Sequence, residues 1–184
     1  MFGAFVMKPL CQILTEFFDM NFVYVNPLEH LVPMPGFVGY RQIEPDIFNS
    51  VTNLRRLIKK ENLGDATFVM PGFYMSSGPR EKEIALMPYN GSDISAYLLA
   101  MALDVPPIFI KKLEGSAPTS ICELQDFQWN KPSAIDSKPI ELIANFVLTE
   151  MIRRKEVLRI FDTNTNSLCE ISVGQRKVKS KIAV

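Results

Sequence analysis

Short runs of β-branched and aromatic residues alternate along the chain with longer segments whose apolar residues recur at helical spacing. This alternation restricts the fold more than any other feature of the sequence. Strands are predicted at 21–25, 67–70, 84–87, 108–110, 157–161 and 168–173, and helices at about 5–18, 44–60, 94–103 and 140–154. Strands that alternate with helices favour a parallel or mixed sheet covered on both faces. The sequence therefore predicts an α/β fold with a mostly parallel sheet and helices on both of its faces.

The first predicted helix carries an apolar stripe made of Leu10, Ile13, Leu14 and Phe17. Pro9 predicts a late start for this helix, because proline is tolerated only in a helix's first turn. Prolines and glycines at 27–39 indicate a long connection, and residues 76–83 are interpreted as a polar turn.

Composition limits the classes of protein to which the chain can belong. Of its 184 residues, 47% are hydrophobic and 22% are charged, which is typical of a chain that buries a core. We expect one domain over residues 1–174, followed by a basic tail at 175–184 that is either a solvated end or the start of a continuation. Lys+Arg and Asp+Glu are both 20, so no overall charge favours nucleic acid or acidic membranes.

Three widely spaced cysteines and the absence of a long apolar run indicate the compartment. The cysteines predict neither a disulfide framework nor a zinc site, and are interpreted as reduced thiols. The apolar opening at residues 1–7 lacks a basic leader, and no stretch is long enough to span a bilayer. We therefore expect a soluble, cytoplasmic protein.

Gly91, Ser92 and Asp93 open a strongly apolar helix that leads into the strand at 108–110. A helix N-terminus presents free backbone N–H groups and a partial positive charge, so it can hold an anion. Gly91 permits a close backbone approach, and Ser92 is predicted to cap the helix. Spacing alone favours an ordinary N-cap over a phosphate site, because caps are far more common.

The block from Gly72 to Gly115 resembles the later part of the catalytic domain of aspartate kinases. Gly72-Phe73 is similar to the family's Gly-Phe strand end, and residues 87–93 are similar to its Leu-Gly-Arg-Gly-Gly-Ser-Asp segment. Weaker similarity covers most of the chain, from Phe2-Gly3-Ala4 through 139–145 to the strand at 159–161 followed by Asp162-Thr163-Asn164. The resemblance implies an amino-acid-kinase-like α/β fold that is incomplete at its N-terminus and lacks the regulatory ACT domains.

The same resemblance implies the site and its ligands. It gives a substrate-binding role to Gly91, Ser92 and Asp93, and a nucleotide-binding role to Lys111, Lys112, Glu114 and Gly115. The implied cofactor is ATP with Mg²⁺, with no metal site in the protein itself. The implied activity is that of an ATP-dependent kinase of amino-acid biosynthesis, a transferase.

Departures from the family's pattern predict a loss of that activity. Ala4 replaces a glutamate on the aspartate side, and Tyr89 replaces an arginine that grips the substrate carboxylate. Lys111-Lys112 replaces Thr-Asp, and nothing corresponds to the first strand with its phosphate-binding lysine. Tyrosine cannot imitate a bidentate guanidinium clamp, and charge neutralisation dominates phosphoryl transfer.

We therefore expect a catalytically degenerate protein, a pseudoenzyme, with a residual nucleotide-binding or regulatory role. Two alternatives remain open at this point. One is an active amino-acid kinase that phosphorylates a carboxylate of aspartate or a related amino acid. The other is an interaction domain without a ligand. A sheet without its first strand would expose an edge, so we also expect association with a second copy or with a related kinase chain.

Overall fold

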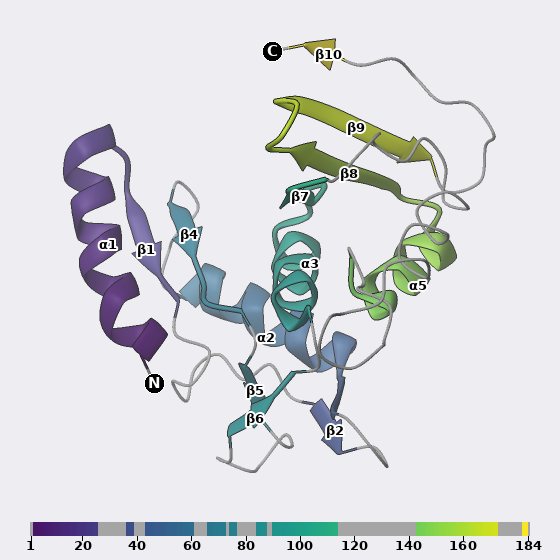
Figure 1. Ribbon diagram of the computed structural model, residues 1–184. Helices are drawn as coiled ribbons and strands as arrows, with labels where there is room; N and C mark the ends of the chain where they lie inside the picture. The colour runs from purple at the N-terminus through teal and green to yellow at the C-terminus, as the bar shows by residue number, and fades with distance from the viewer. Residues whose placement is uncertain are drawn as a thin grey trace. The chain divides into compact units, whose positions relative to one another are not determined.

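The computed structural model describes residues 2–25, 36–38, 43–60, 66–72, 74–76, 84–87, 90–113, 143–172 and 182–183 (Figure 1). The chain divides into two compact units, residues 1–105 and 106–184. The single domain expected over residues 1–174, with a tail beyond it, stays a prediction. Among the described residues, no helix combines the length and the apolar character needed to cross a membrane.

The described residues of the first unit form three helices and six short strands. The helices are α1 (Phe2–Phe18), α2 (Ile47–Lys60) and α3 (Gly91–Leu103). The strands are β1 (Phe22–Tyr24), β2 (Gly36–Val38), β3 (Ile43–Pro45), β4 (Thr67–Val69), β5 (Tyr74–Ser76) and β6 (Ile84–Leu86). β1 pairs with β4 in parallel, with Val23 opposite Phe68, whereas β2–β3 and β5–β6 are antiparallel pairs.

These pairs confirm the predicted strands at β1, β4 and β6 but add three strands that the sequence did not predict. β2 and β3 lie within and beside the stretch interpreted as a long connection. Gly36 begins β2 and Pro45 ends β3, and both residue types are disfavoured in strands, so propensity alone misses this pair. β5 is likewise unpredicted, and its last residue, Ser76, was interpreted as the start of a polar turn.

Helix α1 does not start late, so that prediction is wrong. The helix runs from Phe2 to Phe18 and contains Pro9 in its interior. Proline removes the hydrogen bond to the carbonyl four residues earlier, at a cost of about 3 kcal/mol. Helical turns on both sides of Pro9 offset this loss, since each further residue that joins the helix adds one backbone hydrogen bond.

The apolar stripe of α1 lies largely at the surface. α1 lies against β1, and the side that is excluded from water carries Cys11, which is buried. Thr15 Oγ1 on this helix also accepts a hydrogen bond from the Phe22 backbone N–H at 3.1 Å. In contrast, Ile13 is 60% exposed and Phe17 is 79% exposed. The sequence therefore identified an apolar face, but most of that face is not part of the core of this unit.

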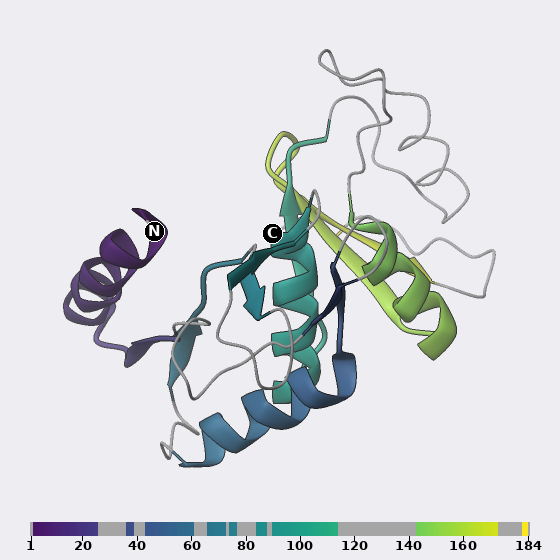
Figure 2. The ribbon, with the colours of Figure 1, turned by 90° about the horizontal axis from the view of Figure 1, so that it is seen from below.

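Helices α2 and α3 pack against each other and supply much of the core of the first unit (Figures 1 and 2). Asp46 precedes α2 and caps it, because its carboxylate accepts bonds from the Asn49 backbone N–H at 3.1 Å and from Asn49 Nδ2 at 2.6 Å. Buried apolar side chains come from both helices: Val51, Leu54, Ile94, Tyr97 and Leu98. Helix α3 is thus held within the unit along most of its length.

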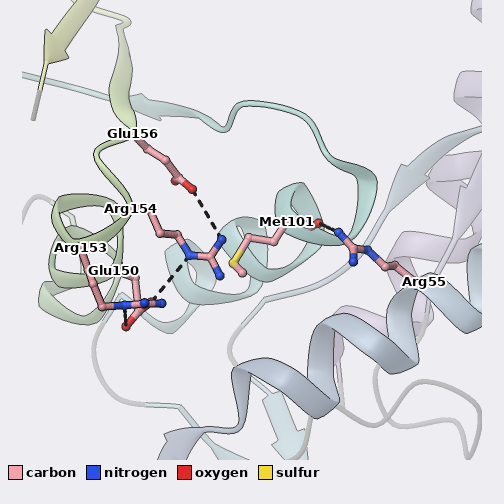
Figure 3. Close-up of polar contacts among 6 residues, drawn as sticks. All are labelled: Arg55, Met101, Glu150, Arg153, Arg154 and Glu156. Atoms are coloured by element: carbon pink, nitrogen blue, oxygen red, sulfur yellow. Dashed lines mark hydrogen bonds and ion pairs between the residues drawn. The ribbon is translucent and has the colours of Figure 1, made fainter.

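Arg55 of α2 caps the other end of α3. Its guanidinium donates to the Met101 carbonyl at 3.0 Å (Figure 3). It also donates to the Ala102 carbonyl at 3.3 Å. These carbonyls belong to the last turn of α3, whose C-terminus carries a partial negative charge. The Asp104 backbone N–H also bonds back to the Ala100 carbonyl from a left-handed conformation, with φ of 58°. Carbonyl groups at the C-terminal end of α3 therefore accept hydrogen bonds from both a side chain and the backbone.

The second unit is a four-stranded sheet with one described helix. Its strands are β7 (Ile108–Lys111), β8 (Val157–Asp162), β9 (Ser167–Ser172) and β10 (Ile182–Ala183), and its helix is α5 (Asn145–Arg154). The order is β10-β9-β8-β7, in which β7 and β8 are parallel and the other two pairs are antiparallel. The α/β character of the chain is confirmed, and a sheet that is mostly parallel stays a prediction.

Burial alternates along β8 as expected for a sheet with one protected face. Leu158 and Ile160 are fully buried, and Arg159 between them is only partly so. Arg159 Nε lies 2.8 Å from Glu170 Oε1 on the paired residue of β9. Helix α5 buries Val147, Leu148 and Met151, and its exposed side carries the Glu150–Arg153 ion pair at 2.7 Å (Figure 3).

Candidate functional site

The start of α3 is one of two regions to which the sequence assigns function. Asn90 is the N-cap residue, in the left-handed conformation with φ of 62°, and makes no side-chain capping bond. The prediction that Ser92 caps the helix is wrong, because the helix begins at Gly91 and Ser92 is an exposed residue of its first turn. Asp93 is buried, and its backbone N–H donates to the Asn90 carbonyl at 2.9 Å.

Two glycines allow neighbouring backbone segments to approach this helix start closely. A Cβ on Gly72, just after β4, would lie 2.5 Å from Ser92 Cα, and a Cβ on Gly91 would lie 2.3 Å from Met87 Cβ. Neither glycine has a positive φ, so space and not backbone conformation requires glycine at both positions. The end of β4, the end of β6 and the start of α3 therefore meet here.

Ser95 fixes the first turn from within. Its hydroxyl donates to the Gly91 carbonyl at 3.2 Å and lies 3.6 Å from Met87 Sδ. A hydrogen bond from a buried side chain therefore stabilises the first turn, while Ser92 remains at the surface. A helix N-terminus carries a partial positive charge that suits a carboxylate or a phosphate, and the Asp93 N–H of this turn is already bonded to the Asn90 carbonyl.

The second region is the carboxyl end of β7, in the other unit. Lys111 ends the strand and is half-buried, and Lys112 after it is exposed. β8 runs parallel to β7, with Lys111 opposite Asp162, so the carboxyl ends of both strands lie at the same edge. Ligands of open α/β sheets bind outside the carboxyl ends of parallel strands. Two lysines at this edge suit an anionic ligand.

The turn that follows β8 forms hydrogen bonds to the backbone at the end of β7. Asp162 accepts hydrogen bonds from the Leu113 and Asn164 backbone N–H groups, each at 3.0 Å, and from the Thr165 hydroxyl at 2.6 Å. Asn164 Nδ2 donates to the Leu113 carbonyl at 2.8 Å. The backbone N–H of Thr163 donates to the Lys111 carbonyl at 2.9 Å. We call residues 162–165 the Asp162 turn.

The carboxylate of Asp162 is fully buried yet well supplied with hydrogen-bond donors. The Thr165 hydroxyl lowers the pKa of Asp162 most, and the backbone N–H groups of Leu113, Asn164 and Thr165 lower it further. Burial acts in the opposite direction but is outweighed. Asp162 is therefore ionised at neutral pH, and its oxygens are occupied by protein donors. It is suited to hold backbone in place and not to contact a ligand itself.

The structure describes most of the residues to which the sequence assigned a site role. Gly91, Ser92 and Asp93 lie together in the first turn of α3, and Lys111 and Lys112 lie together at the end of β7. Glu114 and Gly115 lie outside the described residues, as does Tyr89. Within the described part of the chain, no group of three or more His, Cys, Asp or Glu side chains could hold a metal ion.

Three residues that contribute to these regions were not assigned a role from the sequence. Gly72 was noted only as part of a strand end, although Pro71-Gly72 is a common signal for a close approach or a turn. Asp162 and Asn164 were noted only as part of a similar strand end. An Asp-Thr-Asn-Thr run is a strong signal for side chains that bond to nearby backbone, but it does not reveal the distant partner Leu113.

Comparison with known proteins adds information about the fold. No protein-family model matches the chain, and no curated protein sequence matches it. Aspartokinase III of E. coli in complex with aspartate and ADP, in the R-state, is similar in structure, with a TM-score of 0.58 and 16% identity over 93% of this chain. The same enzyme with lysine and aspartate, in the T-state, gives 0.58 and 15% over 86%.

Aspartate kinase of Clostridium acetobutylicum is also similar, with a TM-score of 0.56 and 15% identity over 92% of this chain. The chain spans only 36%, 36% and 37% of the lengths of these three solved chains. Identities this low carry information about the fold and not about activity. The chain therefore has an aspartokinase-like fold.

Proposed function

We propose that the chain is a catalytically degenerate, aspartate-kinase-like protein that retains nucleotide binding and acts in regulation. The observation that carries the proposal is the start of α3. There Gly72 and Gly91 let neighbouring segments pack closely against the first turn, in which Ser92 is the exposed residue, and the helix has no side-chain cap. A helix N-terminus offers an anion a partial positive charge and backbone N–H groups, and the exposed Ser92 lies at this end of α3.

The lysines at the end of β7 are a separate feature, in the second unit, that by itself suits a nucleotide rather than an uncharged ligand. Lys111 and Lys112 replace the Thr-Asp of the aspartate kinase pattern, so this edge of the sheet gains positive charge. E. coli aspartokinase III, which is similar in fold, was solved with ADP. We extend nucleotide binding to this chain, with Mg-ATP and Mg-ADP as the ligands to be tested.

Loss of catalysis follows from the residues that depart from the pattern. Tyr89 stands in place of an arginine, and Ala4 in place of a glutamate. Removing a single charged contact from a transition state typically costs 10²–10³-fold in rate, and such losses multiply when they are independent. We therefore expect phosphoryl transfer to aspartate to be undetectable above the uncatalysed reaction.

The two alternatives differ from this proposal in measurable ways. An active amino-acid kinase would turn over ATP in the presence of aspartate or a related amino acid. An interaction domain without a ligand would melt cooperatively and give no heat with any nucleotide.

Calorimetric titration with Mg-ATP and Mg-ADP tests the proposal. We expect dissociation constants in the micromolar range that Asp93→Ala alters, because Asp93 lies in the first turn of α3. Glu16→Ala, which removes an exposed carboxylate from α1, serves as the control. The absence of heat at millimolar nucleotide, from a protein that melts cooperatively, would refute nucleotide binding. ADP release that depends on aspartate would refute degeneracy.

The exposed stripe of α1 supports association with a second copy or with a related kinase chain. Leu10, Ile13 and Phe17 lie on one side of the helix and are all exposed. Contiguous exposed apolar patches mark interaction surfaces, and these three side chains share one side of the helix. We expect a dimer in sedimentation velocity at micromolar concentration, which Ile13→Ser and Phe17→Ser shift toward monomer. A clean monomer of the unmodified chain would refute self-association.

A further inference from the structure

The Asp162 turn binds Leu113, which lies just after the end of β7, as well as residues of its own loop. Asp162 binds the Leu113 N–H at 3.0 Å, and Asn164 Nδ2 binds the Leu113 C=O at 2.8 Å. Both backbone groups of Leu113 are therefore fixed by side chains of the turn. Leu113 itself is fully buried, so water does not compete for these bonds.

Lys112 lies between Lys111 and Leu113, the two residues whose backbone groups bond to the Asp162 turn. On its N-terminal side, the Lys111 carbonyl accepts from the Thr163 N–H at 2.9 Å, and the Thr163 hydroxyl adds a longer contact at 3.4 Å. On its C-terminal side stands Leu113 with its two bonds. The backbone of Lys112 is thus held on both sides, whereas its side chain is exposed.

We propose that the Asp162 turn is a positioning device for Lys112, which fixes the base of that side chain so that its ammonium meets a phosphate group of a bound nucleoside diphosphate or triphosphate. The inference rests on the nucleotide binding proposed above and adds the residues that make it effective. Lys112 contacts the phosphate, while Asp162 and Asn164 act through Lys112 and do not touch the ligand.

The physical reason is conformational entropy. Lysine carries its charge on a flexible four-carbon stem, and ordering that stem on binding has an entropic cost. A backbone already fixed at its base limits the volume that the ammonium explores, so less freedom is lost when the phosphate arrives. A turn that served only to close the β8–β9 loop would need the bonds to Asn164 N–H and Thr165, but not those that reach across to Leu113.

The donors around Asp162 indicate that its role is indirect. Its carboxylate is buried and already accepts three hydrogen bonds from the protein. A direct ligand contact would require those bonds to break. Asn164 differs, because it is exposed and its side-chain amide donates to the Leu113 carbonyl. Replacing it removes that hydrogen bond without changing a buried side chain.

A double-mutant cycle tests the inference on the full chain, with Mg-ADP as the probe in calorimetry. The variants are Lys112→Ala, Asn164→Ala and the double variant. Asp162→Asn is a second substitution that weakens the hydrogen bonds to the Leu113 backbone. Ser167→Ala is the matched control, because the Ser167 hydroxyl bonds to Thr165 at 2.7 Å and not to Leu113. Thermal melts confirm that every variant is folded.

We expect Lys112→Ala and Asn164→Ala each to weaken Mg-ADP about two- to fivefold, the upper part of the range for one exposed charged contact. In the Lys112→Ala background, Asn164→Ala should change the dissociation constant by less than about twofold, because nothing remains to be positioned. Asp162→Asn should follow Asn164→Ala, and Ser167→Ala should match the unmodified chain.

The outcomes separate this inference from the function on which it rests. No heat from the unmodified chain at millimolar Mg-ADP would overturn nucleotide binding and the inference together. Binding that Lys112→Ala weakens but Asn164→Ala and Asp162→Asn leave unchanged would overturn only the positioning role. Losses that simply multiply in the double variant would also overturn it, because the turn would then act independently of Lys112.

Discussion

Gly72→Ala is the substitution whose outcome the packing at the start of α3 determines most directly. The added Cβ would lie 2.5 Å from Ser92 Cα and 2.7 Å from Ser92 Cβ. Carbon atoms pack at about 3.5–4.0 Å, so the two backbone segments must separate by roughly 1 Å. Because the nearest atom is backbone, no side-chain rotation relieves the overlap. The end of β4 or the start of α3 has to move.

The magnitude follows from two opposing effects. Replacing glycine by alanine at an ordinary φ stabilises a protein by about 0.4–1 kcal/mol, because the unfolded chain loses conformational freedom. Overpacking of a well-filled site costs about 1–3 kcal/mol. The overlap is with backbone, so the second effect should win, and we expect a net loss of about 1–2 kcal/mol in the free energy of unfolding.

Urea denaturation measures this loss. With a slope of about 2 kcal/mol/M, the midpoint should fall by roughly 0.5–1 M at unchanged slope. Ser92→Gly in the same chain should not restore the midpoint, because the closest contact is with Ser92 Cα. Ser92→Ala alone, on the exposed first turn, is the control and should shift the midpoint little. A Gly72→Ala variant as stable as the unmodified chain would refute the close approach.

Three further perturbations have defined outcomes. Arg55→Ala should lower the free energy of unfolding by about 0.5–1 kcal/mol, because it uncaps α3, whereas its exposed neighbour in Arg56→Ala should have little effect in the same urea titration. Asp46→Ala should cost about 1 kcal/mol through loss of the α2 cap, and Asp46→Asn, which keeps an acceptor for the Asn49 N–H, should cost less. The folded pKa of Asp162 lies below its ordinary value of 3.8, so its contribution to stability is present above that value and is lost as the pH falls through the folded pKa. The difference in urea midpoint between the unmodified chain and Asp162→Asn should therefore be constant from pH 7 to about 4.5 and shrink below 3.8; a difference that grows on acidification would contradict the assignment.

The sequence predicted the elements whose signal is local. α2, α3, β1, β4, β7, β8 and β9 all carry a clear apolar period or a β-branched run, and each lies close to its predicted bounds. The helix predicted at 140–154 is described from Asn145 onward as α5. Periodicity identifies such elements because each depends on residues only a few positions apart.

The features that the sequence missed depend on distant partners. Periodicity marked the apolar face of α1 but could not reveal that Ile13 and Phe17 lack cover within their unit. Asn90 begins α3 without capping it by a side chain, so a rule based on caps placed the start wrongly. The bond from Leu113 to Asp162 joins residues 49 positions apart, and no local pattern connects them.

The short connection between β8 and β9 has a consequence for the order of folding. These strands are joined by residues 163–166, whereas β7 must reach β8 from a position 49 residues away in the bond from Leu113 to Asp162. Hairpins close within about 1–10 μs, and distant parallel pairing is slower. The turn after β8 should therefore be formed before Leu113 arrives, so the strand docks onto an acceptor that is already in place. Asn164→Ala should then accelerate unfolding and leave the refolding rate unchanged in stopped-flow measurements, while a slower refolding rate would mean that β7 docks before the rate-limiting step.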